Sequence, residues 1–199
     1  NADVGHYVSL AYPPTDRHWV GLAAPPAMAY YDVLNHRLMY IVRNTEGIWS
    51  EPEIVDATGD VGHYASLRIS RDRRHHVVYY DADNRDLKYS YKDDPNTMGG
   101  WATPTILDAN GDVGQHAAMA IGPEGRRHVV YYDADAKDLK YVTGDDTHGW
   151  SVPEVLDAIG DVGKYPSITV YYEGRKEKMN GAYEGRYPHI VYYDASHGN

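Results

Sequence analysis

Two short runs of aspartate are the first candidates for chemistry, because their spacing suits a metal ion. Each run begins with the aspartate of a Tyr-Tyr-Asp triplet and reads Asp-x-Asp-x-x-Asp. Dense oxygen donors on a tight loop suit Ca²⁺, which takes six to eight hard oxygen ligands. The alternative is that the carboxylates close Asx turns at hairpin ends, and no bidentate glutamate follows at the EF-hand position. Calcium binding and turn closure are both open for Asp81, Asp83, Asp86, Asp133, Asp135 and Asp138.

A second candidate set surrounds the motif Gly-Asp-Val-Gly, which occurs three times, with a partial copy near the start of the chain. Its aspartates and the rings that follow it could bind a ligand through hydrogen bonds and ring stacking. Glutamine and lysine replace histidine after two copies, which excludes a symmetric histidine cage but leaves a metal site of His6, His63 and His116 conceivable. The other interpretation is the polar lining of a solvated channel. The candidate ligand-binding residues are His6, Tyr7, Asp60, His63, Tyr64, Asp112, His116, Asp161 and Tyr165.

Catalysis has no comparable signature in the sequence. Enzyme sites need asymmetric, convergent groups, whereas His76, His128 and His189 recur at equivalent places and indicate a repeated structural hydrogen bond. Gly-x-Ser-x-Gly, His-Glu-x-x-His and phosphate-binding glycine loops are absent. Carboxylates near histidine or tyrosine could serve a glycoside hydrolase or a polysaccharide lyase, but no spacing selects one pair. No catalytic residue is assigned.

Composition excludes several classes of partner and chemistry. The chain has 199 residues and a net charge of −10, which argues against nucleic acid as a partner because phosphate binding needs a basic surface. The absence of cysteine excludes disulfides, thiolate metal sites and a cysteine nucleophile. The longest nearly apolar run, residues 20–31, contains two prolines and is too short to insert across a membrane. The chain starts at Asn1 rather than methionine, so we expect a processed or partial chain.

The elements that position these residues are predicted by an internal repeat of about 50 residues. Tyr-Tyr-Asp occurs at 30–32, 79–81, 131–133 and 192–194, and Trp-x-x-Pro at 49–52, 101–104 and 150–153. In the second copy, four segments are rich in Val, Ile, Tyr and Trp, at 65–70, 75–81, 87–92 and 101–107. Turn-forming residues separate them. Each unit is therefore predicted to be a four-stranded antiparallel meander.

Such meanders must stack, because one alone buries only part of its apolar surface. Four strands per unit at this period predict an all-β fold, a β-propeller of four-stranded blades. The repeated tryptophans then pack between blades, or alternatively stack on sugar rings. The basic runs 71–74 and 126–127 are expected to be solvated hairpin tips on the face opposite the aspartate loops. The blades are expected at about 4–55, 61–107 and 113–156, with a half blade at about 162–199.

The repeat resembles a known group of proteins. Asp-Ala-x-Gly-Asp-Val-Gly, His-x-Val-Tyr-Tyr-Asp-Ala, Asp-Leu-Lys-Tyr and Trp-x-x-Pro are similar to propeller repeats of secreted bacterial proteins, loosely grouped with sialidase-type (BNR-like) propellers. The resemblance implies the propeller fold and an extracellular or cell-surface location. It does not imply sialidase activity, because the expected Asp-box, Ser-x-Asp-x-Gly-x-x-Trp, is degenerate at 44–49 and 146–150. No sialidase arginine triad can be assigned either.

The fourth unit contains only two of its four strands before the sequence ends. One interpretation is that the chain is a fragment of a longer propeller. The other is that a second molecule completes the half blade, because an uncovered strand is an edge open to pairing. The second interpretation predicts self-association through the unfinished fourth blade.

The leading functional hypothesis is a non-enzymatic extracellular recognition or assembly module that binds a glycan or a protein subunit, with calcium as a stabilising ion. Near-equivalent blades suit repeated, avid binding. One alternative is a glycoside hydrolase or polysaccharide lyase with its site at the channel mouth. Another is a structural subunit of a fibre or surface lattice.

Overall fold

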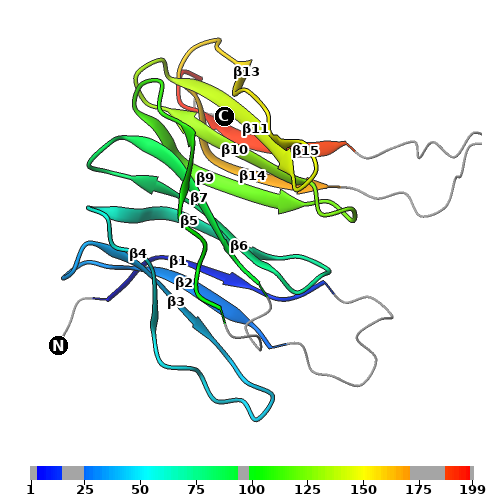
Figure 1. The fold of residues 1–199 in the computed structure, drawn as a ribbon. Helices are drawn as coiled ribbons and strands as arrows, with labels where there is room; N and C mark the ends of the chain where they lie inside the picture. The colour runs from blue at the N-terminus through cyan, green and yellow to red at the C-terminus, as the bar shows by residue number, and fades with distance from the viewer. Residues whose placement is uncertain (1–3, 15–24, 94–98, 171–186, 198–199) are drawn as a thin grey trace, which may run out of the picture.

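The computed structural model describes residues 4–14, 25–93, 99–170 and 187–197, and these residues form four antiparallel β-sheets that follow one another along the chain (Figure 1). No helix occurs among them, so none of these residues belongs to a helix able to cross a membrane. The all-β prediction and the four-stranded antiparallel sheets are confirmed.

The first two sheets have the predicted meander order. The first contains β1 (Val4–Ala11), β2 (Ala27–Asp32), β3 (Arg37–Val42) and β4 (Glu53–Asp56). The second contains β5 (Val61–Ile69), β6 (His75–Asp81), β7 (Asp86–Lys92) and β8 (Thr105–Asp108). In both, strands that are neighbours in sequence are hydrogen-bonded neighbours, which is the usual arrangement of consecutive strands.

The third sheet has a divided outer edge, and the fourth is described for two strands. The third contains β9 (Val113–Ile121), β10 (Arg127–Asp133), β11 (Asp138–Asp145), β12 (Gly149–Trp150) and β13 (Glu154–Asp157). Both β12 and β13 pair with β11. The fourth contains β14 (Val162–Val170) and β15 (Pro188–Asp194). Residues 171–186 of the predicted half blade lie outside the described residues.

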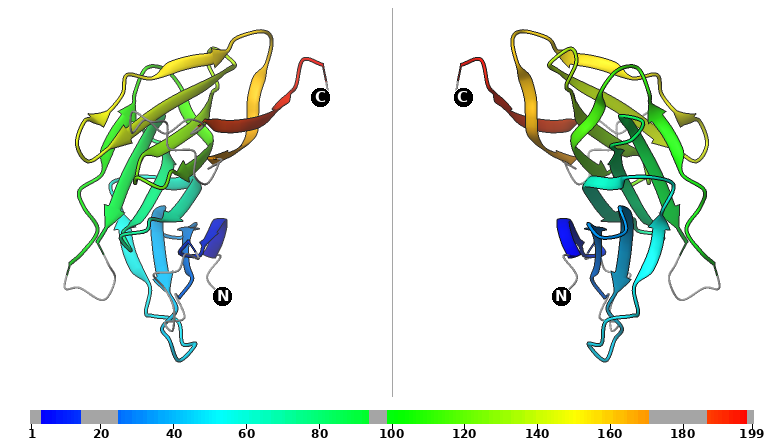
Figure 2. Two further views of the ribbon diagram at one scale, coloured as in Figure 1. Left: turned by 90° about the vertical axis from the view of Figure 1, so that its right-hand side faces the viewer. Right: turned by 90° about the vertical axis from the view of Figure 1, so that its left-hand side faces the viewer.

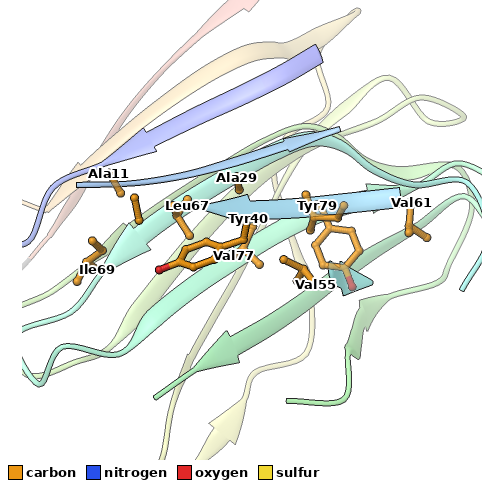
Figure 3. Packing of buried hydrophobic residues seen from close by; sticks show 11 residues of the cluster. Ala11, Ala29, Tyr40, Val55, Val61, Leu67, Ile69, Val77 and Tyr79 are labelled. Carbon is orange, nitrogen blue, oxygen red and sulfur yellow. The ribbon is translucent and has the colours of Figure 1, made fainter. Parts of the chain in front are cut away.

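The core lies between sheets, where the face of one sheet packs on the next. Leu67, Val77 and Tyr79 of the second sheet pack against Ala29 and Tyr40 of the first (Figure 3). All five side chains are fully buried. Two further apolar clusters join the second sheet to the third and the third to the fourth. Because each sheet packs an apolar face on the next, a unit by itself would leave that face exposed to water.

The repeated tryptophans and histidines have the structural roles that repetition favours. Trp101 packs edge-on against Tyr40 of the first sheet, with ring centroids 5.1 Å apart. Trp150 packs in the same way on Tyr89 of the second sheet, at 4.8 Å. The packing of these two tryptophans between sheets is therefore confirmed.

The histidine prediction is confirmed for two of its three members. Buried His76 is hydrogen-bonded through Nδ1 to the hydroxyl of Tyr89 at 2.6 Å. His128 makes the same contact with Tyr141, also at 2.6 Å. Burial, reinforced by Arg127, lowers the pKa of His76 to about 3. The ring is therefore neutral at physiological pH, which suits a structural hydrogen bond.

Buried ion pairs connect neighbouring sheets. Lys140 Nζ on β11 lies 2.6 Å from a carboxylate oxygen of Asp108, at the end of β8 in the preceding sheet. The hydroxyl of Tyr131 donates to the same carboxylate at 2.7 Å. Lys88 and Tyr79 repeat the arrangement on Asp56 one sheet earlier, with the lysine 3.6 Å away. The attraction between the buried carboxylate and lysine, together with the tyrosine hydrogen bond, offsets the cost of removing both charges from water.

The four sheets stand side by side in an arc, and the described residues do not close a ring (Figure 2). The first strands β1, β5, β9 and β14 contact one another in sequence order and lie toward the concave side of the arc (Figure 2). The concave side is therefore lined by the segments that follow the Gly-Asp-Val-Gly motifs.

Candidate functional site, an aromatic row on the first strands

Each first strand carries a bulge at the same position. The register with the second strand shifts after His6, His63, Gln115 and Lys164. The residue that follows each shift has a left-handed backbone, with φ values of 50–55° at Tyr7, Tyr64, His116 and Tyr165. Such values are uncommon for residues other than glycine and store strain of order 1–3 kcal/mol each. A strained conformation that recurs in four sheets marks a place where side-chain direction matters.

The bulges bring four rings into one continuous row across the sheets. Ring centroids lie 4.8 Å apart for Tyr7 and Tyr64, 4.5 Å for Tyr64 and His116, and 4.3 Å for His116 and Tyr165. Adjacent rings are tilted by 51–58°, so the row is corrugated rather than flat. Together with Val8, Ala65 and Ala117, the four rings line a shallow hollow of about 210 Å³. The side chains of Tyr7 and Tyr165 are 40% and 71% exposed.

The aspartates of Gly-Asp-Val-Gly lie beside this row and link the sheets. Asp60 accepts a hydrogen bond from the hydroxyl of Tyr31, one sheet earlier, at 2.6 Å, and contacts Nε2 of His63 at 2.8 Å. The equivalent aspartates of the next two sheets make the same pair of contacts. Asp112 accepts hydrogen bonds from Tyr80 and Gln115. Asp161 accepts hydrogen bonds from Tyr132 and Lys164. These carboxylates are therefore already engaged within the protein.

The protonation states favour binding over acid–base chemistry at neutral pH. Burial disfavours ionisation of Asp60, but hydrogen bonds from Tyr31 and His63 lower its pKa overall. Burial, with Tyr7 alongside, raises the pKa of Tyr64 to about 12. Burial and then Lys164 lower the pKa of His116. At neutral pH Tyr64 therefore presents a neutral phenol and His116 a neutral imidazole, and both can donate hydrogen bonds and stack.

The structure brings together most of the predicted ligand-binding residues. Tyr7, Tyr64, His116 and Tyr165 form the row itself. His63 lies between Tyr7 and Tyr31, with centroid distances of 5.1 and 4.3 Å. His6 is exposed and pairs in register with Tyr31. Among the described residues, no three His, Asp or Glu side chains are arranged to hold a metal ion, so the three-histidine metal site gains no support.

The aspartates predicted to bind calcium contact lysines and backbone amides. Asp81 accepts from the amide of Asn84 at 3.0 Å and lies 2.6 Å from Lys88 Nζ. Asp133 accepts from the amides at 135 and 136, at 3.1 and 2.9 Å. Asp83 and Asp135 accept from the amides of residues 60 and 112. Burial raises the pKa of Asp86 and Asp138, and neighbouring carboxylates contribute. The contacts of Asp81 and Asp133 with following amides close turns, whereas Asp83 and Asp135 join the loop after the second strand to the loop before the first strand. Calcium binding stays a prediction.

Chelation gives a direct test of the calcium prediction. Because the lysines already neutralise part of the carboxylate charge, we expect EDTA to leave the melting temperature unchanged. A ligand that binds only the folded state stabilises it, and by more as the free ligand concentration rises above its Kd. A melting temperature that falls with EDTA and recovers with added CaCl₂, but not with MgCl₂, would instead establish a calcium site.

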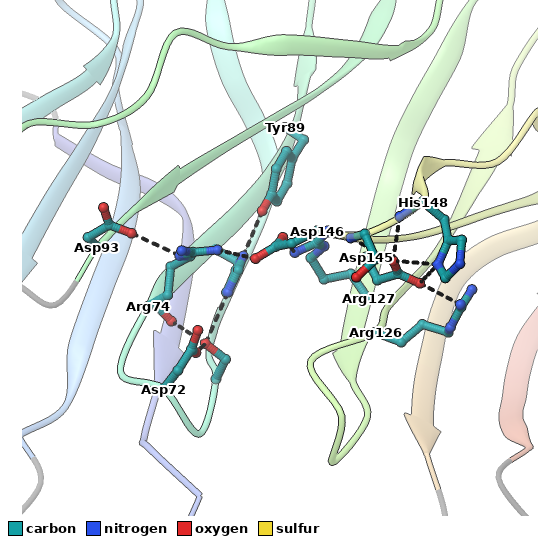
Figure 4. Close-up of polar contacts among 12 residues, drawn as sticks. Asp72, Arg74, Tyr89, Asp93, Arg126, Arg127, Asp145, Asp146 and His148 are labelled. Carbon is teal, nitrogen blue, oxygen red and sulfur yellow. Dashed lines mark hydrogen bonds and ion pairs between the residues drawn. The ribbon is translucent and has the colours of Figure 1, made fainter.

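The basic runs at the other ends of these strands were expected to be solvated tips, which holds for exposed Arg71 but is wrong for Arg74 and Arg127, which form ion pairs. Arg127 is only 4% exposed. Asp146 bridges two sheets by pairing with Arg127 at 2.6 Å and with Arg74 (Figure 4). Asp145 pairs with Arg126 beside it. A hollow of about 470 Å³ lies among these side chains. The adjacent aspartates in the third unit are the signal that could have suggested these pairs.

Comparison with known proteins places the chain in no family. No family model matches it, and no curated protein matches it. Among solved structures, it is similar to the K499G mutant of NanB sialidase from Streptococcus pneumoniae, with 15% identity and a TM-score of 0.48 over 82% of this chain. A complex of NanB sialidase from the same organism gives 13% identity and a TM-score of 0.49 over 88% of this chain. The chain spans 27% and 30% of those two proteins.

Proposed function

We propose that the four sheets are blades of a β-propeller and that the aromatic row binds a glycan, as a non-enzymatic extracellular or cell-surface recognition module. The observation that carries the proposal is the row itself: four equivalent rings, each held by a left-handed residue, side by side along the hollow. Rings with polar edges can stack on a sugar and donate to its hydroxyls. Strain repeated at four positions fits a functional constraint.

Charge favours a neutral glycan over an acidic one. The chain carries a net charge of −10, and ionised carboxylates lie directly beside the row. An anionic polymer would be repelled, while a neutral oligosaccharide would exchange water for stacking and hydrogen bonds. Near-equivalent rings also suit a polymer with repeating sugars, since several weak contacts along one chain reinforce one another.

The test is calorimetric titration with neutral oligosaccharides (cellohexaose, xylohexaose and mannohexaose) and with hexagalacturonate as the acidic probe. We expect one of the neutral probes to bind. Tyr64→Gly should weaken that binding about tenfold or more, which corresponds to the loss of about 1.4 kcal/mol. Glycine adopts positive φ readily, which offsets part of the stability lost with the ring contacts to Tyr7 and His116. Circular dichroism at the titration temperature checks that the variant is folded.

Trp49→Ala is the matched control, because it tests the alternative that tryptophan stacks on the sugar. Trp49 is 38% exposed and lies away from the row on the outer part of the first sheet. We expect this variant to bind as the unmodified chain does. Binding lost with Trp49→Ala but kept with Tyr64→Gly would overturn the assignment of the row. Release of new reducing ends from a bound probe would overturn the non-enzymatic assignment.

A further inference from the structure

The outer face of the first sheet exposes apolar residues whose equivalents in the other sheets are buried or half-buried. Leu10 is 51% exposed, whereas the equivalent residues Leu67, Met119 and Ile168 are 0–6% exposed. Those three lie in the apolar clusters that join each sheet to the one before it. Tyr12, 64% exposed, has its equivalent in Ile69, which is 6% exposed. The first sheet thus carries the same apolar face as the others, with no preceding sheet among the described residues to cover it.

At the other end of the arc, the fourth sheet exposes residues on its opposite face that the other sheets bury. Val191 on β15 is 69% exposed, whereas its equivalents Ala29, Val78 and Val130 are fully buried under the following sheet. Tyr193 is 41% exposed, and its equivalents Tyr31, Tyr80 and Tyr132 are 4–7% exposed. The two ends of the arc therefore present the two halves of one repeated interface.

The interface between neighbouring sheets is formed mainly by the first and second strands of the earlier sheet, which correspond to β14 and β15 in the fourth sheet. Within the chain, β5 packs chiefly on β1 and β2 and less on β3, and β9 and β14 follow the same rule. A serine fixes the alignment twice: the amide of Leu67 donates to Oγ of Ser9 at 2.9 Å, and the amide of Met119 donates to Oγ of Ser66 at 3.1 Å. Ser167 on β14 is equivalent to Ser9 and Ser66. Its hydroxyl could accept a hydrogen bond from the amide of a residue equivalent to Leu67.

We propose that two copies of this chain associate head to tail, with the outer face of the first sheet of one copy packed on the open face of the fourth sheet of the other. Leu10 of one copy then covers Val191 of its neighbour, and the amide of Leu10 donates to Ser167. Third strands add to the internal interfaces, and the described fourth sheet contains β14 and β15, so the proposed interface between these strands is smaller than the internal ones. Association should therefore depend on concentration. A heterologous contact of this kind closes into a ring or extends as a filament.

Sedimentation velocity across a wide concentration range, with paired variants, tests the proposal. We expect the sedimentation coefficient of the unmodified chain to rise with concentration. Leu10→Asp and Val191→Asp should each stay monomeric at the same concentrations, because each lacks one half of the interface. An equimolar mixture of the two should form a heterodimer and nothing larger, since only one productive pair of faces remains.

Ile48→Asp is the control, because Ile48 is 60% exposed in a turn of the first sheet, away from both faces. It should associate like the unmodified chain. Each variant is first shown to unfold at the temperature of the parent, and Tyr12→Glu and Tyr193→Glu replace any variant that does not. A parent chain that stays monomeric throughout would overturn the proposal. So would single variants that still associate, or a mixture that stays monomeric.

Discussion

Replacing Asp108 by alanine is expected to lower the free energy of unfolding by about 3–5 kcal/mol, the range for removing one partner of a buried ion pair. Lys140 is 8% exposed, and Asp108 is its nearest carboxylate at 2.6 Å. Asp133 is farther away, at 3.6 Å. The variant would also leave the buried hydroxyl of Tyr131 without the acceptor it now reaches at 2.7 Å. Urea denaturation of the two proteins measures the difference.

Asp157→Ala is the control offered by the repeat itself. Asp157 ends β13 as Asp108 ends β8, and it accepts from the hydroxyl of Tyr192 at 2.6 Å. Tyr192 is 36% exposed, so water can replace the lost hydrogen bond. We therefore expect a much smaller loss of stability than at Asp108. Similar losses at both positions would show that burial of the lysine is not what makes Asp108 important.

The sheets could be predicted because the information is local. Alternating β-formers separated by Asp, Asn, Gly and Pro specify strands and turns within each unit, and the repeat gives the same answer several times. The contacts between sheets could not be predicted in the same way. Lys88 and Lys140 occupy positions that look like a solvated strand surface, yet both are buried against an aspartate of the preceding sheet. Such pairs depend on how units stack, which no single unit encodes.

The candidate site also combines features that the local sequence predicts with contacts between sheets that it does not. The first-strand tyrosines and His116 could be placed near a channel because they follow Gly-Asp-Val-Gly in each unit. Their left-handed backbone could not be predicted from the local sequence, because positive φ is common for glycine but uncommon for tyrosine and histidine. The aspartates of the motif were expected to meet a ligand, but the structure pairs them with tyrosines of the preceding sheet. Hydrogen bonds between sheets cannot be predicted from the sequence of one unit, because they depend on how two units pack together.

The second large effect concerns the last glycine of Gly-Asp-Val-Gly, which allows neighbouring sheets to approach closely. Gly114 has φ of +105°, and a Cβ there would lie 2.9 Å from the Cα of Leu87 in the preceding sheet. Gly114→Ala would add a left-handed penalty of about 1–2 kcal/mol and overpacking of about 1–3 kcal/mol. We expect the free energy of unfolding to fall by about 3 kcal/mol, measured by urea denaturation.

Gly5→Ala separates these two contributions, because the first sheet has the same backbone without the neighbour. Gly5 has φ of +93°, and the nearest atom to a Cβ there is a methyl carbon of Val8 at 3.9 Å. Its substitution should therefore carry the backbone penalty alone, about 1–2 kcal/mol. Equal losses at the two positions would mean that backbone conformation by itself requires glycine. A larger loss at Gly114 would mean that the motif keeps its last glycine chiefly so that the third strand of one sheet can lie against the first strand of the next.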